Sequence, residues 1–499
     1  MRKDIREEEK RQAKNKAKSG KSLCLLSKIL GIVYLVALAV FEYLIISSGV
    51  IPTKFIILQA VVLLLISILI LPMLLINRAR KKNKIVATVI SVILLAVYGV
   101  GIVYLGSTMG FLNGIIASSQ TVTYDVVVGN DNRITEEDTS GLQGAKVLMP
   151  NSSDDDYIDA AQVLQEDFEV TFEQSSKDNK SLLESLVGNA QDIVFIRDGY
   201  YQQVCDNSDD VSKGTRIVYT VKISKAALAA KSTDVTSQTF NVLLTGNDTK
   251  GELQEGLRSD VNMIMTVNPK TKKIHLTSIP RDYYIALPQN GEMDKLTHTG
   301  IYGVDCTSAT LENLFGIEIN YYVRVNFTAV EKLVDAIGGL TIKSDYAFTT
   351  SGRFNNGFEF VVGENQVDGK KALAFCRERH AFADGDNQRV KDQQIVIQAI
   401  VDKLTTSTVL LTDYTDVLGA IEKYMETNMS ADEIKSLVKM QLDDMSKWKF
   451  SKYAVVGGEG SHTNMCYSLG CNAWVMPQSE KSIAKAVKEM NEIRNNPNK

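Results

Sequence analysis

Residues 240–282, FNVLLTGNDTKGELQEGLRSDVNMIMTVNPKTKKIHLTSIPRD, decide the fold of the second half of the chain. Runs of apolar and β-branched residues predict strands at 240–244, 261–267 and 273–279, and the Asn268-Pro269 turn joins the last two as a hairpin. Charged side chains gather where these strands end, namely Asp248, Arg258, Asp260, Arg281 and Asp282. Loop charges beside strands are usually solvated, but paired carboxylates beside arginines also suit a metal ion and an anionic substrate.

A second polar block follows at residues 375–394, FCRERHAFADGDNQRVKDQQ. It contains Arg377, Arg379, Asp386, Arg389 and Gln393. Arg377 and Arg379 are two residues apart, so on an extended segment both side chains would face the same side. We therefore expect one face to present two guanidinium forks to one anion.

The two blocks together resemble the signature of the LytR-CpsA-Psr family, because several linked motifs occur in the same order. These motifs are Gly246-Asn247-Asp248, Arg258-Ser259-Asp260, Ser278 to Asp282, Arg377-Glu378-Arg379, and Asp386 with Arg389 and Gln393. The resemblance covers about residues 240–405. The membrane region ahead of it is similar to that of the capsule-linked CpsA branch.

Charge is divided unevenly along the 499 residues, although the formal net charge is only −4. Residues 1–111 hold 16 Lys+Arg against 5 Asp+Glu, and the remainder holds 39 against 54. A basic, apolar front and an acidic back indicate a membrane-anchored protein rather than a nucleic-acid binder.

Three apolar stretches, at about 23–48, 55–76 and 85–106, are each long enough to span a bilayer. The segment before them has no cleavage site typical of a signal peptide. The basic loop at 77–84, NRARKKNK, predicts a cytoplasmic N-terminus and leaves everything after about residue 107 outside the cell. Glu42 lies within the first span, where either pairing with another helix or a proton or substrate role would explain a carboxylate.

The predicted fold class is α/β, with a small α/β accessory domain between the membrane helices and a catalytic domain. In the catalytic domain, strands alternating with helices predict a central mixed sheet covered by helices on both faces. The expected parts are a cytoplasmic basic tail at 1–22, three transmembrane helices within 23–106, a connector at 107–120, the extracellular accessory domain at 121–237, the catalytic domain with its C-terminal extension at 238–490, and a disordered tail at 491–499.

The resemblance implies a membrane-anchored extracellular phosphotransferase that depends on Mg²⁺. Its donor would be a polyisoprenyl-diphosphate-linked polysaccharide held in the membrane lipid, and its acceptor a peptidoglycan hydroxyl. The branch implies capsular polysaccharide, with teichoic-acid-like polymers as the second candidate, and capsule-assembly membrane proteins as further partners. No nucleic-acid partner is expected.

The same resemblance assigns roles to residues of this chain. Asp248 and Asp260 would hold Mg²⁺. The residues expected to be catalytic are Asp248, Asp260, Arg258, Arg281 and Arg379. The residues expected to bind substrate phosphate are Arg258, Arg281, Lys295, Arg377, Arg379, Arg389 and Gln393. Asp392 departs from the pattern, because many family members carry an arginine there, and one phosphate contact is thereby in doubt.

Two other functions use the same sequence features. Hydrolysis of the lipid diphosphate would employ the same residues with water as the acceptor. A membrane regulator or scaffold would bind the polymer without turning it over, but it has little reason to gather so many arginines around paired aspartates.

Other chemistries lack their motifs. The four histidines, His275, His298, His380 and His462, show no zinc-ligand spacing, and there is no Walker A or G-x-S-x-G sequence. Cys466 and Cys471 are the one close cysteine pair on the expected outer side, and both a disulfide and two free thiols fit the sequence.

Overall fold

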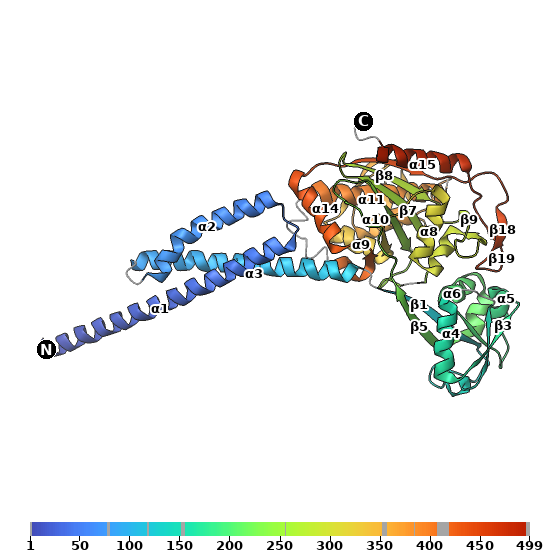
Figure 1. Cartoon of the computed structure of the whole chain (residues 1–499), viewed down its shortest axis with the longest axis horizontal. Helices are drawn as coiled ribbons and strands as arrows, with labels where there is room; N and C mark the ends of the chain where they lie inside the picture. The colour runs from blue at the N-terminus through green and yellow to red at the C-terminus, as the bar shows by residue number, and fades with distance from the viewer. Residues whose placement is uncertain are drawn as a thin grey trace. The chain divides into compact units, whose positions relative to one another are not determined.

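The computed structural model describes residues 2–76, 80–116, 119–150, 155–254, 256–351, 357–383, 385–406 and 419–495. These residues form two compact units, which are described separately (Figure 1). The first unit comprises Met1–Asn113 with Ala431–Met445, and the second comprises Gly114–Ser430 with Ser446–Lys499.

The first unit contains the three apolar helices predicted from the sequence. They are α1 (Arg2–Ser48), α2 (Thr53–Leu75) and α3 (Lys81–Ile115), and each is long and apolar enough to cross a membrane. The expected basic tail is therefore the first part of α1. The expected connector at 107–120 is largely helical, because α3 continues to Ile115 and buries Phe111 and Leu112 in its last turns.

Glu42 has a hydrogen-bond partner on a neighbouring helix. Of the two explanations given for this carboxylate, pairing with another helix agrees with that contact. The side-chain amide of Gln59 on α2 donates to Glu42 Oε1 at 2.7 Å. Tyr34 and Ser67 form a second polar contact between α1 and α2, with 2.7 Å between their oxygens. Each contact satisfies a polar group that would be costly to leave unpaired among apolar side chains.

The second unit begins with a five-stranded sheet in the order β3-β2-β4-β1-β5. Its elements are β1 (Ser119–Gly129), η1 (Ser140–Leu142), β2 (Lys146–Pro150), α4 (Asp155–Phe168), β3 (Thr171–Ser175), α5 (Asn179–Glu184), β4 (Ile193–Arg197), α6 (Asp198–Asn207), α7 (Asp209–Gly214) and β5 (Thr215–Ala226). Strands β2, β3 and β4 run parallel, while β1 runs antiparallel to both β4 and β5.

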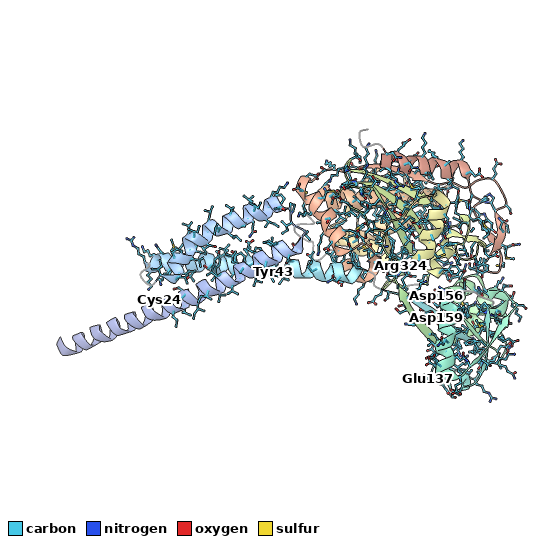
Figure 2. The ribbon with its side chains drawn as sticks, viewed as in Figure 1. Cys24, Tyr43, Glu137, Asp156, Asp159 and Arg324 are labelled. Carbon is cyan, nitrogen blue, oxygen red and sulfur yellow. The ribbon has the colours of Figure 1, made fainter. Side chains whose placement is uncertain are left out.

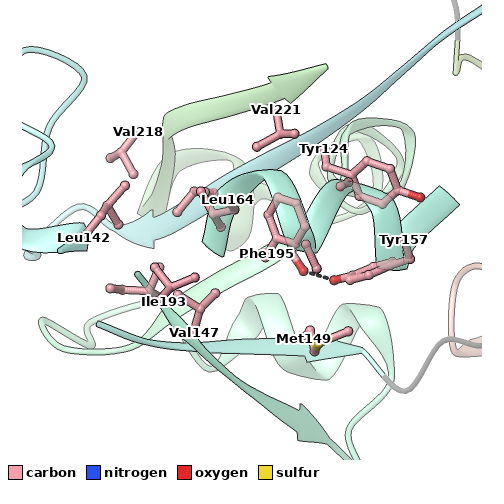
Figure 3. Packing of buried hydrophobic residues seen from close by; sticks show 14 of the residues in the cluster. Tyr124, Leu142, Val147, Met149, Tyr157, Leu164, Ile193, Phe195, Val218 and Val221 are labelled. Atoms are coloured by element: carbon pink, nitrogen blue, oxygen red, sulfur yellow. Dashed lines mark hydrogen bonds between the residues drawn. The ribbon is translucent and has the colours of Figure 1, made fainter. Parts of the chain in front are cut away.

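Helix α4 packs on this sheet through an apolar and aromatic core (Figure 3). The Tyr157 hydroxyl donates to the Phe195 carbonyl, and the two rings meet edge to face with 5.6 Å between centroids. The Tyr157 hydroxyl is thereby satisfied although the residue is buried, and the ring contributes its full apolar surface.

The three strands within residues 240–282 form the centre of a mixed, six-stranded sheet in the order β16-β11-β6-β7-β8-β17. Its strands are β6 (Phe240–Asn247), β7 (Val261–Asn268), β8 (Lys273–Ile279), β11 (Tyr321–Asn326), β16 (Met425–Thr427) and β17 (Lys449–Ala454). The predicted hairpin is confirmed, because β7 pairs antiparallel with β8. Strand β11 runs parallel to β6, and β17 runs parallel to β8. At the β16 edge, Arg324 of β11 pairs with Glu426 at 2.8 Å (Arg324 is labelled in Figure 2).

Helices cover both faces of this sheet, as predicted. Buried side chains of α8 (Val304–Phe315) and α15 (Glu480–Asn495) join those of β6, β7 and β8 in one apolar cluster. A second cluster joins α9 (Phe327–Ala336), α10 (Gly369–Arg377) and α11 (Asp386–Thr406). Because both faces are covered, the central strands are buried along nearly their whole length, including polar side chains such as Thr266 and Thr277.

Shorter elements connect these layers. They are β9 (Tyr284–Ala286), β10 (Met293–Lys295), η2 (Leu296–Tyr302), β12 (Leu340–Ser344), β13 (Phe348–Thr349), β14 (Glu359–Phe360), β15 (Gly363–Val367), η3 (Glu422–Tyr424), α14 (Ala431–Asp444), β18 (Thr463–Cys466) and β19 (Cys471–Trp474).

The C-terminal helix is longer than the sequence pattern indicated. Residues 491–495, expected to be disordered, form the last turn of α15. Met490 is buried, and the side-chain amide of Asn268 donates to the Ile493 carbonyl at 2.8 Å. This hydrogen bond satisfies one of the carbonyls that a helix C-terminus leaves open.

Candidate functional site

Hairpin geometry brings the first block of charged residues to one edge of the sheet. β6 ends at Asn247, β7 begins at Val261 and β8 ends at Ile279, and adjacent strands of the three run antiparallel. Asp248 follows β6 directly, Asp260 precedes β7 directly and Arg281 lies two residues after β8, so all three lie at the same edge. An ion pair joins Arg281 to Asp260.

Asp260 is the most constrained residue of this edge. It is 7% exposed, and its Oδ1 accepts from Arg281 Nη1 at 2.6 Å and from Thr297 Oγ1 at 3.5 Å. Its backbone N–H donates to the Gly246 carbonyl at 2.8 Å, which ties it to β6. The other carboxylate oxygen, Oδ2, is buried and has no hydrogen-bond partner within the described residues. An acceptor atom in that state is available to a ligand.

Asp248 lies at the surface beside Asp260. Partial loss of water around its carboxylate raises its pKa, and the charge of Asp260 raises it further. The guanidinium groups of Arg258, Arg281 and Arg377 oppose these effects. The two aspartates are thus close enough to repel each other, and the arginines lie within reach of both.

Arg377 and Arg379 do not share one face of a strand, so that expectation was wrong. Helix α10 ends at Arg377, and the chain turns immediately afterwards. The Arg377 guanidinium lies over the ring of Phe327, 4.4 Å from its centroid. Burial lowers the pKa of Arg377, while Asp248 raises it, which places this cation beside the two aspartates.

Glu378, between these arginines, points inward and is fully buried. Its Oε1 accepts the backbone N–H groups of Arg379, His380 and Ala381 at 2.9, 2.7 and 3.0 Å. Ser351 donates both its N–H, to Oε2 at 2.6 Å, and its hydroxyl, to Oε1 at 2.9 Å. This carboxylate fixes the turn that carries Arg379, a role that the sequence analysis missed.

Asp386 and Arg389 complete the cluster from the first turn of α11. Arg389 Nη2 lies 2.7 Å from Asp386 Oδ1, and Arg379 Nη1 lies 3.9 Å from the same oxygen. Burial lowers the pKa of Arg389, and the neighbouring charges of Arg281 and Arg379 lower it further. Gln393, one turn later, donates to the Cys376 carbonyl at 3.4 Å and so contacts the end of α10.

Two predicted phosphate-binding residues are engaged elsewhere. Lys295 Nζ donates to Asp282 Oδ1 at 3.0 Å. Arg258 Nη2 donates at 2.8 Å to Asp206, which lies on α6 beside the five-stranded sheet. Both cations remain at the rim of the cluster, but an anion would compete with these carboxylates for them.

Asp392, where the sequence departs from the family pattern, is buried on α11 about one turn after Arg389. The side-chain amide of Gln388 donates to its Oδ1 at 2.9 Å, and its Oδ2 has no partner within the described chain. Burial raises the pKa of Asp392 to about 7. It therefore supplies no cation to the site.

The aspartates are the candidate metal ligands, and we tested whether they suit Mg²⁺. No group of three His, Cys, Asp or Glu side chains arranged for a metal occurs among the described residues. Mg²⁺ keeps several waters and needs only one or two protein carboxylates beside substrate phosphates. The orphaned Oδ2 of Asp260 with Asp248 beside it fits that requirement.

The histidines and cysteines do not form a further site within the cluster. His298 is buried, with its Nδ1 2.5 Å from Asp294 and 2.9 Å from Ser468 Oγ. Cys466 and Cys471 face each other across β18 and β19, and both are free thiols in this structure.

A sheet edge that gathers arginines around two aspartates is a candidate site for an anionic ligand. The profile of the LytR_cpsA_psr family matches residues 203–489, more than half of the chain. The chain belongs to that family.

Relatives with assigned names match about half of the chain. A protein of Enterococcus faecalis is 34% identical over 255 residues, which are 50% of this chain and 80% of the relative. One of Bacillus anthracis is 37% identical over 225 residues, 45% of this chain and 71% of the relative. Both are named polyisoprenyl-teichoic acid–peptidoglycan teichoic acid transferase TagU. The crystal structure of B. subtilis TagU aligns with a TM-score of 0.40 at 28% identity, over 52% of this chain and 98% of that one.

The buried carboxylate of Glu378 gives a prediction about pH. Burial alone would raise its pKa, but the donating N–H groups hold it below its usual value of 4.5. Its contribution to stability is therefore present above pH 4.5 and is lost as pH falls through the lowered pKa. Glu378→Gln should lower the free energy of unfolding by about 1.5–3 kcal/mol at pH 7, since charge-assisted hydrogen bonds are lost.

Denaturant unfolding of the detergent-solubilised chain at several pH values would measure this difference. The gap between wild type and Glu378→Gln should narrow below about pH 4.5, where the wild-type carboxylate itself becomes protonated. Glu364→Gln, at an exposed position, removes the same charge and serves as the control. A gap that stays constant with pH would contradict the assignment.

Proposed function

We propose that the protein is a membrane-anchored phosphotransferase that moves a polyisoprenyl-diphosphate-linked glycopolymer onto a hydroxyl of peptidoglycan outside the cell. The family membership and the names of the two relatives support the reaction class. The three apolar helices support placement at the membrane, where a lipid-linked donor is confined.

One observation carries the proposal, namely the crowding of like charges. Arg389 is 8% exposed and lies within electrostatic reach of both Arg281 and Arg379. Bringing buried cations together costs free energy unless an anion joins them. The Nε atom of Arg389 is buried without a hydrogen-bond partner in the described chain, so a donor remains for such an anion. Arg281 Nε also makes no hydrogen bond there, although it lies 3.6 Å from Asp282 Oδ2.

The chemistry follows from this arrangement. The acceptor hydroxyl attacks the phosphorus next to the sugar, the bond from that phosphorus to the bridging oxygen breaks, and polyisoprenyl phosphate leaves. The hydroxyl proton passes to a carboxylate or to solvent, and the product is a phosphodiester. Guanidinium groups held in place before the donor binds would stabilise the growing charge of the leaving phosphate without reorganisation.

Asp248 and Asp260 would hold Mg²⁺ when the donor is bound. The ion would supply further neutralisation of the diphosphate. Asp260 holds Arg281 through one oxygen and leaves the other, Oδ2, for the ion. The same aspartate would thereby align the metal and an arginine.

We propose capsular polysaccharide as the polymer, on the likeness of the three-span membrane region to the capsule-linked branch. The names of the matched relatives favour the second candidate, a teichoic acid. Both polymers reach the site as the same lipid diphosphate, so the arginine cluster does not distinguish them.

The proposal is tested by incubating the full chain in detergent with lipid-linked oligosaccharide, Mg²⁺ and peptidoglycan fragments. We expect a conjugate of oligosaccharide and fragment joined by a phosphodiester, detected by mass spectrometry. Free phosphosugar without conjugate would instead identify a hydrolase. Donor binding without either product would identify a scaffold or regulator. Either of these two results would contradict the proposal that the protein is a transferase.

The metal assignment predicts a defined loss. Asp248→Asn and Asp260→Asn keep the side-chain shape but remove the charge that Mg²⁺ needs, so Mg²⁺ affinity and conjugate formation should both fall at least about tenfold. Asp432→Asn, at an exposed position in the other unit, is the control and should change neither quantity. Titration calorimetry with Mg²⁺ in the presence of donor would measure affinity. Unchanged affinity in both variants would exclude the two aspartates as ligands.

Substitutions of Arg379 separate the contribution of its positive charge from that of its forked geometry. If its fork binds two phosphate oxygens, Arg379→Lys should lose nearly as much activity as Arg379→Ala, about 10- to 150-fold for a lost charge-assisted bond. A purely electrostatic role predicts that Arg379→Lys retains most of the activity and that its remaining defect shrinks at low salt. Conjugate formation measured at low and ordinary salt separates the two roles, and full activity of Arg379→Lys at ordinary salt would contradict direct contact.

A further inference from the structure

A cavity of about 750 Å³ lies within the second unit, between the five-stranded sheet and the loops that follow β9 and β18. Its lining includes Pro150, Ser175, Asn179, Tyr200, Tyr284 and Tyr467. None of these residues belongs to the arginine cluster. The reaction proposed above gives this cavity no role.

The cavity occupies a position where α/β sheets commonly bind ligands. Pro150 and Ser175 are the last residues of β2 and β3, and Tyr200 lies in the first turn of α6, directly after β4. The three strands are parallel, so their carboxyl ends meet at one edge. Ligands of open α/β sheets bind in the crevice outside this edge.

Tyrosine rings dominate the lining. Tyr157 and Tyr200 are nearly buried, and their hydroxyls bond to the Phe195 carbonyl and to Tyr302. Tyr284 donates to the Met465 carbonyl at 2.8 Å. These bonds fix the orientation of the rings. Tyr467 is 37% exposed and belongs to the same wall.

The charges around the cavity are mixed in sign. Lys177 and Glu292 are exposed lining residues of opposite charge, and the Asp178 carboxylate caps α5 by accepting from Ser181 N at 2.8 Å. A phosphate site needs a surplus of donors and cations, as in the arginine cluster. Aromatic walls with scattered hydroxyl, amide and single charged groups instead fit a ligand with apolar faces and many hydroxyls.

An exposed aromatic surface continues from this cavity along β18 and β19. Met465 lines the cavity, and the register places it on the same face of the hairpin as Trp474, diagonally across the two strands. Trp474 is 52% exposed and stacks on His462 with 5.7 Å between ring centroids. A large ring left in water on a short hairpin is a separate sign of a binding surface.

The two walls of the cavity are fastened to each other. The side-chain amide of Asn179 donates to the Ser468 carbonyl at 3.2 Å. Gly470 has φ +69°, and a Cβ there would lie 2.2 Å from Asp178 Cβ, so only glycine allows the hairpin turn to approach α5 this closely. The cavity is therefore preformed rather than dependent on closure.

We propose that this cavity and the hairpin face beside it bind a short run of sugar residues from a glycan chain. Pyranose rings present an apolar C–H face that stacks on tyrosine and tryptophan, and their hydroxyls suit the serine, asparagine and glutamate groups between the rings. Helix α6 links this site to the arginine cluster, since Tyr200 lines the cavity and Asp206, about 9 Å further along the helix, holds Arg258. The glycan would belong either to the acceptor or to the donor polymer, and this last step rests on the proposed function.

Binding of soluble glycans to the full chain in detergent tests the proposal without requiring transfer. One probe is a peptidoglycan tetrasaccharide freed of its peptides, and the other is the wall-polymer oligosaccharide released by hydrofluoric acid from the source cells. Neither probe carries a lipid diphosphate. Binding of the first identifies the acceptor chain, and binding of the second identifies the donor polymer.

Tyr467→Ala and Trp474→Ala should each weaken binding by roughly 2- to 10-fold, the loss expected for one aromatic contact. Tyr346→Ala, which removes a tyrosine that is 51% exposed and outside the cavity, is the matched control and should bind as wild type does. Arg379→Ala should retain glycan binding but lose transferase activity. A failure of the glycan-binding proposal can therefore be told apart from a failure of the proposed function. Absence of binding by both probes, or binding unaffected by both aromatic changes, would overturn the inference.

Discussion

The contact between Asp260 and Arg281 is the interaction on which the rest of the site depends. A carboxylate that is 7% exposed would be strongly unfavourable without a cation, and Arg281 supplies one at 2.6 Å. Asp260 is tied to β6 through its backbone, and Arg281 follows β8 directly, so the pair joins the two strands that flank β7. Removing Arg281 would leave the buried Asp260 carboxylate without its nearest cation, whereas Arg281 without Asp260 would keep Asp282 at 3.6 Å. The pair therefore fixes two of the candidate site residues against each other.

Around this pair the protein holds several arginines, and it holds them on rigid supports. Phe327 lies beneath Arg377, Glu378 fixes the turn before Arg379, and Asp386 holds Arg389. Each support fixes a cation in place before a substrate arrives, so less conformational entropy is lost on binding. Such pre-organisation distinguishes this cluster from a surface that merely carries positive charge.

Much of this arrangement could be predicted from the sequence, because apolar runs and turns specify strands and hairpins locally. The strands within 240–282 and the meeting of Asp248, Asp260 and Arg281 at one edge followed from that pattern. The C-terminal ends of α3 and α15 could not be predicted in this way, because they depend on tertiary burial of Phe111 and Met490 rather than on local composition. The pairing of Lys295 with Asp282, and the support from Glu378, likewise depend on three-dimensional contacts that spacing alone does not specify.

The salt bridge from Arg258 to Asp206 links the six-stranded sheet to the five-stranded one. One member lies in the motif before β7, and the other on a helix that belongs to the five-stranded sheet. The pair is partly exposed and contributes little to stability, so its effect is on orientation. A substitution that shifts α6 would therefore move Arg258 without touching the family's signature residues. Exchange of the five-stranded module between relatives would have to carry both members of this contact, so the two sheets of the second unit would be exchanged as one piece.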